Sequence, residues 1–152
     1  MSNHTFVYAT YIATTPEKLW EVLTSGEFTK KYFFGREVQS DWEEGAEVKY
    51  LRGNGELDVS GKVLNCEPYC NLSFTWIHAE DSTERSQPTI VTFELTPMDD
   101  TVKLTLIHEN LLEVDYTVER DTFRGYNNGW PAILSNLKSY LETGKTLQAV
   151  QA

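Results

Sequence analysis

The sequence is poor in positive charge. It has 13 Lys plus Arg against 23 Asp plus Glu, which gives a formal net charge of -10 at pH 7. This charge opposes binding to nucleic-acid phosphates and to anionic membrane surfaces. Long apolar stretches are missing too: no segment approaches the ~20 apolar residues of a spanning helix, and residues 1–6 lack a basic secretory signal. We therefore expect a cytoplasmic protein that neither binds nucleic acid nor inserts into a membrane.

Cysteine and histidine are scarce as well. Cys66 and Cys70 have three residues between them, which is not the spacing of a redox motif or a zinc knuckle, and no histidine lies nearby. The sequence also lacks a phosphate-cradling glycine loop and the Gly-x-Ser-x-Gly signature of serine hydrolases. We expect two reduced thiols, no metal and no cofactor.

Aromatic residues, in contrast, are plentiful, with four Trp, eight Tyr and seven Phe. Near the C-terminal end, apolar residues recur at spacings of three and four, which predicts a long helix that ends at Gly144. The stripe consists of Phe123, Tyr126, Trp130, Ile133, Leu134, Leu137, Tyr140 and Leu141. Because Pro131 removes a backbone donor, we expect this helix to kink or restart near Trp130.

The N-terminal part predicts a strand followed by two short helices. Residues 6–13 are apolar and β-branched enough for a strand. Thr15 then supplies an N-cap and Pro16 the first helical position, so a helix should begin there and end at Gly26. A second short helical or irregular piece is expected over residues 28–33.

Six strands should follow, and two turns predict the register of their hairpins. A two-residue type I′ turn at Asn54-Gly55 places Tyr50 opposite Val59. A turn centred on Asp99-Asp100 gives three further pairs: Leu95 with Leu104, Phe93 with Leu106, and Val91 with His108. Between these hairpins the strand 72–78 alternates, with an inner face of Leu72, Phe74, Trp76 and His78. Residues 80–87 are polar and predict a mobile loop.

Several segments together resemble one family. They are Ile12, Ala13, Pro16, Glu17, Leu19 and Trp20, then Trp42 and Gly45, then Phe74-Thr75-Trp76, then Gly129-Trp130-Pro131 with Leu134, Asn136, Leu137 and Leu141-Glu142-Thr143-Gly144. The chain resembles the bacterial AHSA-like branch of the START-like, or SRPBCC, superfamily, named after the activator of the heat-shock protein 90 ATPase. The resemblance covers nearly the whole chain, so we expect residues 1–152 to form a single START-like domain.

This resemblance implies an α+β helix-grip (START/Bet v-like) fold. In such a fold a curved antiparallel sheet of six to seven strands wraps around a long C-terminal helix, two short helices follow the first strand, and a cavity lies inside. Similar superfamily members bind lipids, sterols, flavonoids or polyketides, and a few catalyse cyclisation or dehydration. Eukaryotic chaperone activators carry an additional N-terminal domain for a principal chaperone contact, and we expect this chain to lack it.

If the inner faces of the strands face the helix, a defined set of residues should line the cavity. These ligand-binding candidates are Tyr50, Val59, Trp76, His78, Val91, Phe93, Leu106 and His108 from the strands, and Phe123, Tyr126, Asn127, Trp130 and Leu134 from the helix. For any single large apolar member a plain core position is the more common interpretation, so the prediction depends on the whole set. Arg36 and Arg52 lie near the expected mouth, where they would contact a ligand carboxylate or form surface ion pairs.

His78 and His108 are the candidate catalytic residues. Both should lie near the same end of the sheet, about 10 Å apart by strand spacing. In an apolar enclosure a neutral imidazole could act as a general base near neutral pH. Alternatively, both are bonded to backbone or water and have no chemical role. No third inward ligand is apparent, since Glu109 should point to the other face, so we expect no metal site.

Three functions follow from these expectations. The first is non-enzymatic binding of a small hydrophobic ligand, lipid-, flavonoid- or polyketide-like, in the cavity by a monomer. The second is a cyclase or dehydratase that uses a cavity histidine as general base. The third is a chaperone-accessory or stress-response role, as the family name suggests.

Overall fold

The computed structural model describes residues 3–150, so Met1, Ser2, Gln151 and Ala152 of the predicted domain lie outside the described residues. Within this range the strands are β1 (His4–Ile12), β2 (Glu37–Gln39), β3 (Glu47–Leu51), β4 (Leu57–Glu67), β5 (Asn71–His78), β6 (Thr89–Met98) and β7 (Thr101–Leu111). The helices are α1 (Pro16–Thr24), α2 (Gly26–Tyr32) and α3 (Tyr126–Thr143), with short 3-10 turns η1 (Glu113–Asp115) and η2 (Gln148–Val150).

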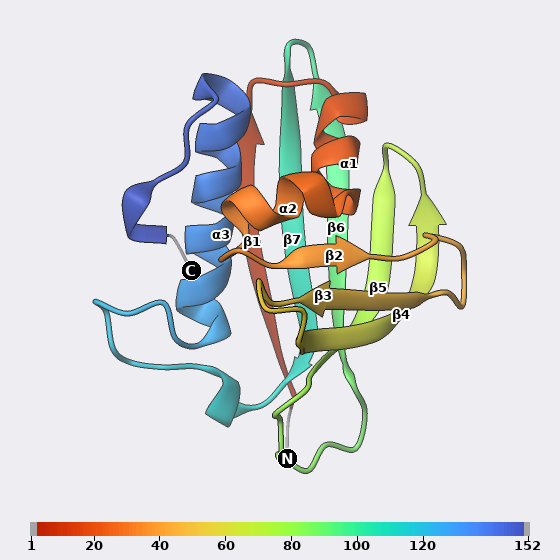
Figure 1. The fold of residues 1–152 in the computed structure, drawn as a ribbon, viewed down its shortest axis with the longest axis vertical. Coiled ribbons are helices and arrows are strands. Elements are labelled where there is room, and N and C mark those ends of the chain that lie inside the picture. The colour runs from red at the N-terminus through yellow and green to blue at the C-terminus, as the bar shows by residue number, and fades with distance from the viewer. Residues whose placement is uncertain (1–2, 151–152) are drawn as a thin grey trace.

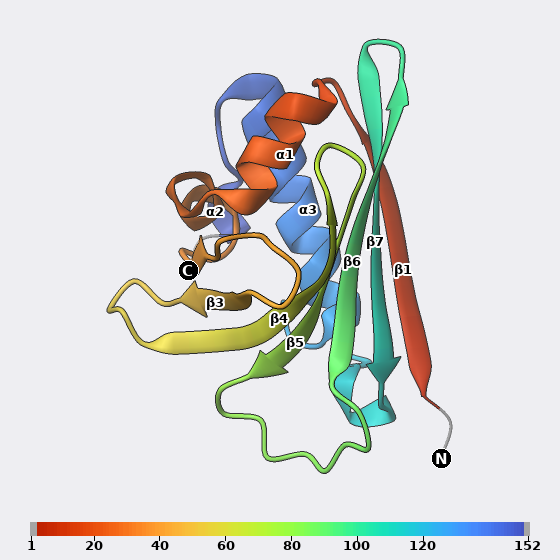
Figure 2. The ribbon, with the colours of Figure 1, turned by 90° about the vertical axis from the view of Figure 1, so that its right-hand side faces the viewer.

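The strands form one antiparallel sheet in the order β1-β7-β6-β5-β4-β3-β2. Figures 1 and 2 show that β1, β7 and β6 run side by side while β4, β3 and β2 curl away from them, so the sheet is strongly curved. Helix α3 lies on the concave side, and α1 and α2 cover the same side near β2. The arrangement is the predicted α+β helix-grip fold.

Helix α1 begins as the sequence predicted, because the Thr15 hydroxyl accepts a hydrogen bond from the Lys18 N–H at 3.2 Å and Pro16 takes the first helical position. The prediction that it ends at Gly26 is wrong. Ser25 has extended backbone angles and separates α1 from α2, and Gly26 is the first residue of α2. A Cβ at Gly26 would lie 2.7 Å from the Val38 carbonyl oxygen, so this glycine permits close packing against β2.

Both predicted hairpin registers are confirmed. Strands β6 and β7 pair Leu95 with Leu104, Phe93 with Leu106, and Val91 with His108, and β3 and β4 pair Tyr50 with Val59. The predicted type I′ turn is wrong, however, because Asn54 does not have a positive φ. Instead the Arg52 N–H donates to the Glu56 carbonyl at 2.8 Å, Gly55 takes a φ of 88°, and a bulge after Tyr50 absorbs the extra residue.

The sequence predicted a kink or a restart near Trp130, and the restart does not occur, because α3 runs through Pro131 as one helix. The helix begins only at Tyr126, which puts Pro131 early in it, and the missing donor affects the carbonyl of the second helical residue alone. Phe123 lies before the helix. The C-terminal end matches the prediction: Gly144 has a φ of 80° and its N–H donates to the Tyr140 carbonyl at 2.8 Å.

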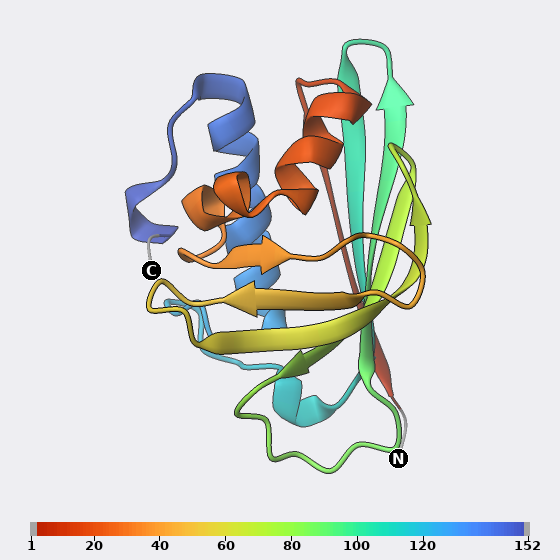
Figure 3. The ribbon, with the colours of Figure 1, turned by 45° about the vertical axis from the view of Figure 1, so that its right-hand side comes forward.

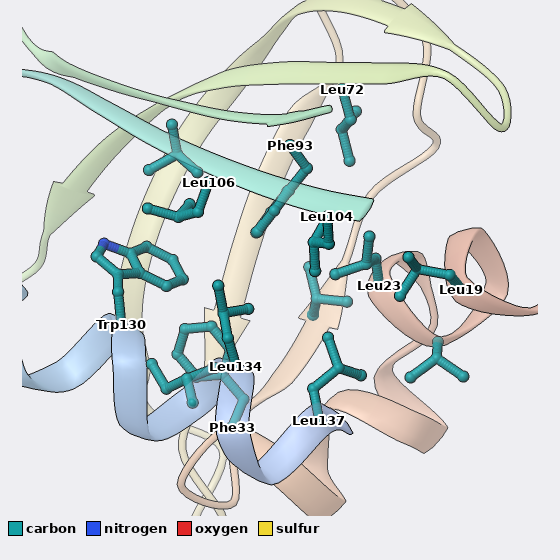
Figure 4. Close-up of a cluster of buried hydrophobic side chains, with 14 of the residues drawn as sticks. Leu19, Leu23, Phe33, Leu72, Phe93, Leu104, Leu106, Trp130, Leu134 and Leu137 are labelled. Atoms are coloured by element: carbon teal, nitrogen blue, oxygen red, sulfur yellow. The ribbon is translucent and has the colours of Figure 1, made fainter. Parts of the chain in front are cut away.

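The core lies between α3, the concave face of the sheet and α1. Figure 4 shows side chains from all three elements meeting there: Trp130, Leu134 and Leu137 from α3, Leu72, Phe93, Leu104 and Leu106 from the sheet, and Leu19 and Leu23 from α1. Asn136 is a buried polar residue of α3. Its amide donates to the Tyr32 carbonyl at 3.1 Å and accepts from the Leu147 N–H at 2.6 Å, which fixes α2 and the C-terminal segment to α3.

Helix α3 also contacts the end of the edge strand β1. Lys138 donates from Nζ to the Tyr11 carbonyl at 2.7 Å, and the Ala13 N–H donates to Glu142 Oε2 at 2.9 Å. The two side chains are themselves an ion pair at 2.7 Å. In residues 3–150 there is no helix long and apolar enough to cross a membrane.

Candidate functional site

A cavity of about 370 Å³ lies at the N-terminal end of α3, between this helix, the sheet and the loops around it. Its apolar wall consists of Phe33, Phe34, Trp76, Val114, Phe123, Trp130 and Ile133, and its polar wall of Arg36, Asp58, His78, Asp115 and Tyr126, with Gly125 and Gly129 between them. Figure 3 shows the lower end of the molecule, where η1 lies close to the loop between β5 and β6.

Three aromatic rings form the inner end of the cavity. The Trp76 and Trp130 ring centroids are 5.2 Å apart, and Phe33 lies 6.0 Å from Trp76 and 5.8 Å from Trp130. All three side chains are buried. At the outer end, Phe34 and Phe123 are 5.8 Å apart, and Phe123 is 44% exposed. The cavity thus runs from an aromatic interior to a partly open aromatic mouth.

Asp58 is the centre of an ion-pair cluster in the polar wall. Arg36 donates from Nε to Asp58 Oδ2 and Arg52 donates from Nε to Asp58 Oδ1, each at 3.1 Å, while Arg52 also pairs with Glu80 at 3.0 Å. These contacts raise the pKa of Arg52, and the hydrogen bonds that Arg52 donates to Glu80 and Asp58 are the main causes. Arg36 and Arg52 therefore form ion pairs within the protein, the second of the two roles expected for them.

A second ion pair ties the β5–β6 loop to η1. Arg85 makes a bidentate contact with Asp115, at 2.8 Å and 2.6 Å, and also bonds Asp81 at 2.9 Å. Burial alone would raise the pKa of Asp115, but hydrogen bonds from Arg85 and from the Leu112 N–H hold it below its usual value. The loop predicted to be mobile is thus anchored by a bidentate contact of the kind that arginine favours.

His108 is fully buried and both of its ring nitrogens are engaged. The Trp130 indole N–H donates to Nδ1 at 3.0 Å, so this nitrogen carries no proton. Nε2 lies 3.0 Å from the Thr89 hydroxyl, which itself donates to the Trp76 carbonyl at 2.6 Å, so Nε2–H must be the donor in that contact. Burial lowers the pKa of His108 to about 3. This neutral imidazole has a structural role and no free nitrogen for general-base catalysis.

His78, by contrast, lines the cavity and is half-buried. Its ring stacks on Tyr126 at 6.0 Å between centroids with an interplanar angle of 28°. Neither of its ring nitrogens has a hydrogen-bond partner among residues 3–150. Of the two histidines, only His78 can offer a ring nitrogen to a bound molecule.

The predicted wall residues separate into three groups. Trp76, His78, Phe123, Tyr126 and Trp130 line the cavity. Tyr50, Val59, Val91, Phe93, Leu106, His108 and Leu134 are buried outside the cavity lining, and all of them except His108 belong to the continuous hydrophobic core. Asn127 has another contact: its side chain donates to the Thr117 carbonyl at 2.9 Å and accepts from the Thr117 N–H at 3.1 Å.

Several lining residues had no counterpart in the sequence-based prediction: Phe33, Phe34, Asp58, Val114, Asp115, Gly125, Gly129 and Ile133. Most of them lie in connections, where hydrophobic periodicity carries no information. The run Phe33-Phe34-Gly35 offered one signal, since two adjacent aromatics before a glycine suit a chain reversal. Phe34 and Gly35 indeed have positive φ values of 48° and 75°.

The sequence model of the family described as Activator of Hsp90 ATPase homolog 1-like protein matches residues 13–142. The chain belongs to this family. The matched residues follow β1 and include α1, α2, β2 to β7 and every residue that lines the cavity. Among curated proteins there is no match to the chain.

Solved structures agree with the family. Protein MLL2253 from Mesorhizobium loti is 25% identical with a TM-score of 0.73, over 91% of this chain and 97% of that one. The Aha1 dimer from Colwellia psychrerythraea is also 25% identical, with a TM-score of 0.70 over 93% and 98% of the two chains. CalU16 from Micromonospora echinospora is 18% identical with a TM-score of 0.68, over 93% and 78%, and shows the fold alone.

Proposed function

We propose that this chain binds one small, largely apolar ring compound in the cavity beside the N-terminal end of α3. The observation that carries the proposal is the cavity itself, because about 370 Å³ of space has its inner end against the hydrophobic core, at Phe33, Trp76 and Trp130. Ligand sites usually measure ~300–1,000 Å³ and are lined by aromatic residues with few polar groups. The small volume favours a compact flavonoid- or polyketide-like molecule over a two-chain lipid.

The charges in the wall favour an uncharged ligand. Arg36 is paired with Asp58, and Asp115 is paired with Arg85. A charged ligand would have to compete with these internal pairs or bring a buried charge without a partner, and both are costly. The Tyr126 hydroxyl and the His78 ring remain for polar contacts.

The two alternatives have less support. A cyclase or dehydratase would depend on His78 alone, since both nitrogens of His108 are engaged. A chaperone-accessory role follows from the family description and from the name of the Colwellia relative. The geometry of residues 3–150 adds no support for it. The monomeric state and the cytoplasmic location stay predictions.

The test is an NMR titration of the labelled protein with a mixed library of lipids, flavonoids and polyketides. We expect shift changes to cluster on Phe34, Trp76, His78 and Tyr126. Ile133→Phe should fill the cavity and remove binding, whereas Ile77→Phe makes the same change at a site that is 44% exposed and should leave binding intact. Equal binding by the two variants, or shifts that avoid the cavity, would overturn the proposal.

A further inference from the structure

The hydroxyl group of Tyr126 has a hydrogen-bond donor that the protein does not use. Its oxygen accepts a hydrogen bond from the Trp76 indole N–H at 3.2 Å. A phenol has one donor and two acceptor positions, so this contact leaves the hydroxyl proton free. No residue in the described range 3–150 accepts that proton, although Tyr126 lines the cavity and burial raises its pKa, which keeps the phenol protonated.

Both indole donors in the cavity wall are already used. The Trp76 N–H is bonded to Tyr126, and the Trp130 N–H is bonded to His108. The Tyr126 ring is held in place by three contacts: the Trp76 N–H, the His108 ring at 4.4 Å and the His78 ring at 6.0 Å. The phenol is therefore a donor held in a fixed position in the cavity wall, so a hydrogen bond from it to a ligand costs little conformational entropy.

We propose that the ligand carries a carbonyl oxygen on its ring system and that Tyr126 donates the hydrogen bond that selects and orients this oxygen. The inference rests on the proposed function and adds the polar group by which the cavity distinguishes between ring compounds. A carbonyl oxygen would accept the free hydroxyl proton. His78 is stacked on the Tyr126 ring, so it lies on the same side of the cavity as this carbonyl. A pure hydrocarbon of the same shape would leave the hydroxyl proton of this partly buried residue without a partner.

The matched probes are 9-fluorenone and fluorene, two flat tricyclic compounds that differ by a carbonyl in place of a methylene. Their dissociation constants are measured by calorimetry or competition for the wild-type protein, for Tyr126→Phe and for Tyr140→Phe. Tyr140 lies on the same helix outside the cavity, with Lys31 Nζ at 3.5 Å from its hydroxyl. We expect Tyr126→Phe to shift the fluorenone-to-fluorene affinity ratio against fluorenone by about twofold to tenfold, the contribution of one neutral hydrogen bond. Tyr140→Phe should leave the ratio unchanged.

A second readout is the infrared carbonyl stretch of bound fluorenone, which a hydrogen bond moves to lower frequency. We expect this shift in the wild-type protein and its loss in Tyr126→Phe. Tyr126→Phe could unfold because the Trp76 N–H loses its acceptor. The Trp76→Phe/Tyr126→Phe double variant then replaces it, since it removes both partners of that hydrogen bond. The carbonyl frequency in the wild-type complex also tests by itself whether the bound carbonyl accepts a hydrogen bond. An unshifted carbonyl in the wild-type complex, or an unchanged affinity ratio, would overturn the inference while leaving the proposed function standing. Failure of fluorene, fluorenone and every library compound to bind would overturn the proposed function itself.

Discussion

The two histidines on the inner face of the sheet mark two regions that look alike in sequence and differ in chemistry. His108 lies in β7 under Trp130, fully buried, with a partner on each ring nitrogen. His78 lies at the end of β5, half-buried, and contacts Tyr126 and Trp76 only through ring faces and edges. Because β5 and β7 flank β6, alternation assigns both to one face, and only packing depth separates them. The difference shows that α3 covers the concave face of the sheet completely at His108 and leaves it accessible from the cavity at His78.

The largest contrast should appear when each histidine is removed. His108→Ala leaves the Trp130 N–H and the Thr89 hydroxyl without partners and opens a buried void, so we expect the free energy of unfolding to fall by about 3–4 kcal/mol. His78→Ala should cost less than about 1 kcal/mol, because its nitrogens have no described partner. Urea denaturation followed by tryptophan fluorescence measures both. If both variants lose a similar amount of unfolding free energy, the contrast between a structural His108 and a His78 without a hydrogen-bond partner among the described residues is wrong.

The second prediction concerns the ion pair between Arg85 and Asp115 at the open end of the cavity. Arg85→Met leaves the mostly buried Asp115 carboxylate without its bidentate partner, and we expect a loss of about 2–3 kcal/mol together with faster amide exchange in residues 79–88. Lys18→Met breaks the exposed pair with Glu21 and should change stability by less than about 0.5 kcal/mol. Urea denaturation measures the loss of stability in both variants, and hydrogen exchange measures the opening of the loop. Unaltered exchange in the β5–β6 loop would mean that Arg85 does not anchor it.

The closed end should also produce a pH dependence. The pKa of His108 is lowered to about 3 in the folded protein from an ordinary value of 6.5, so below pH 6.5 the unfolded chain takes up a proton that the folded protein cannot. Stability is therefore complete above pH 6.5 and falls as pH falls, by about 2 kcal/mol between pH 7 and pH 5 for this one group. His108→Gln should flatten the slope in that interval. If stability falls equally steeply with pH in His108→Gln, the pH dependence comes from other groups.

The smallest effect concerns Asn127, which the sequence placed among the ligand-binding residues. Because its amide bonds both backbone groups of Thr117, we expect Asn127→Ala to cost about 1 kcal/mol and to increase amide exchange at Thr117. Asn128→Ala removes a single exposed bond to the Glu119 carbonyl and should cost less. If Asn127→Ala instead weakens ligand binding without altering exchange at Thr117, the residue belongs to the ligand site.

The sequence was most informative where local rules determine the structure. The Asp99-Asp100 turn and the alternation around it gave the register of β6 and β7, and Thr15 and Pro16 gave the start of α1. The position of the cavity was harder to predict, because it depends on which side chains leave space unfilled between α3 and the sheet. Asp58 and Asp115 illustrate this: each becomes part of the wall only through an arginine distant in sequence, and no periodicity signals such a pairing.

The contact between α3 and the end of β1 has a consequence for how copies of the chain meet. An edge strand normally offers free carbonyl and amide groups to any passing strand, which is the route to edge-to-edge aggregation. Here the Tyr11 carbonyl is already bonded by Lys138 and the Ala13 amide by Glu142. A strand arriving at this end of β1 would have to separate an ion pair before it gained a hydrogen bond. The helix that borders the cavity therefore also protects this end of the edge strand from pairing with another strand.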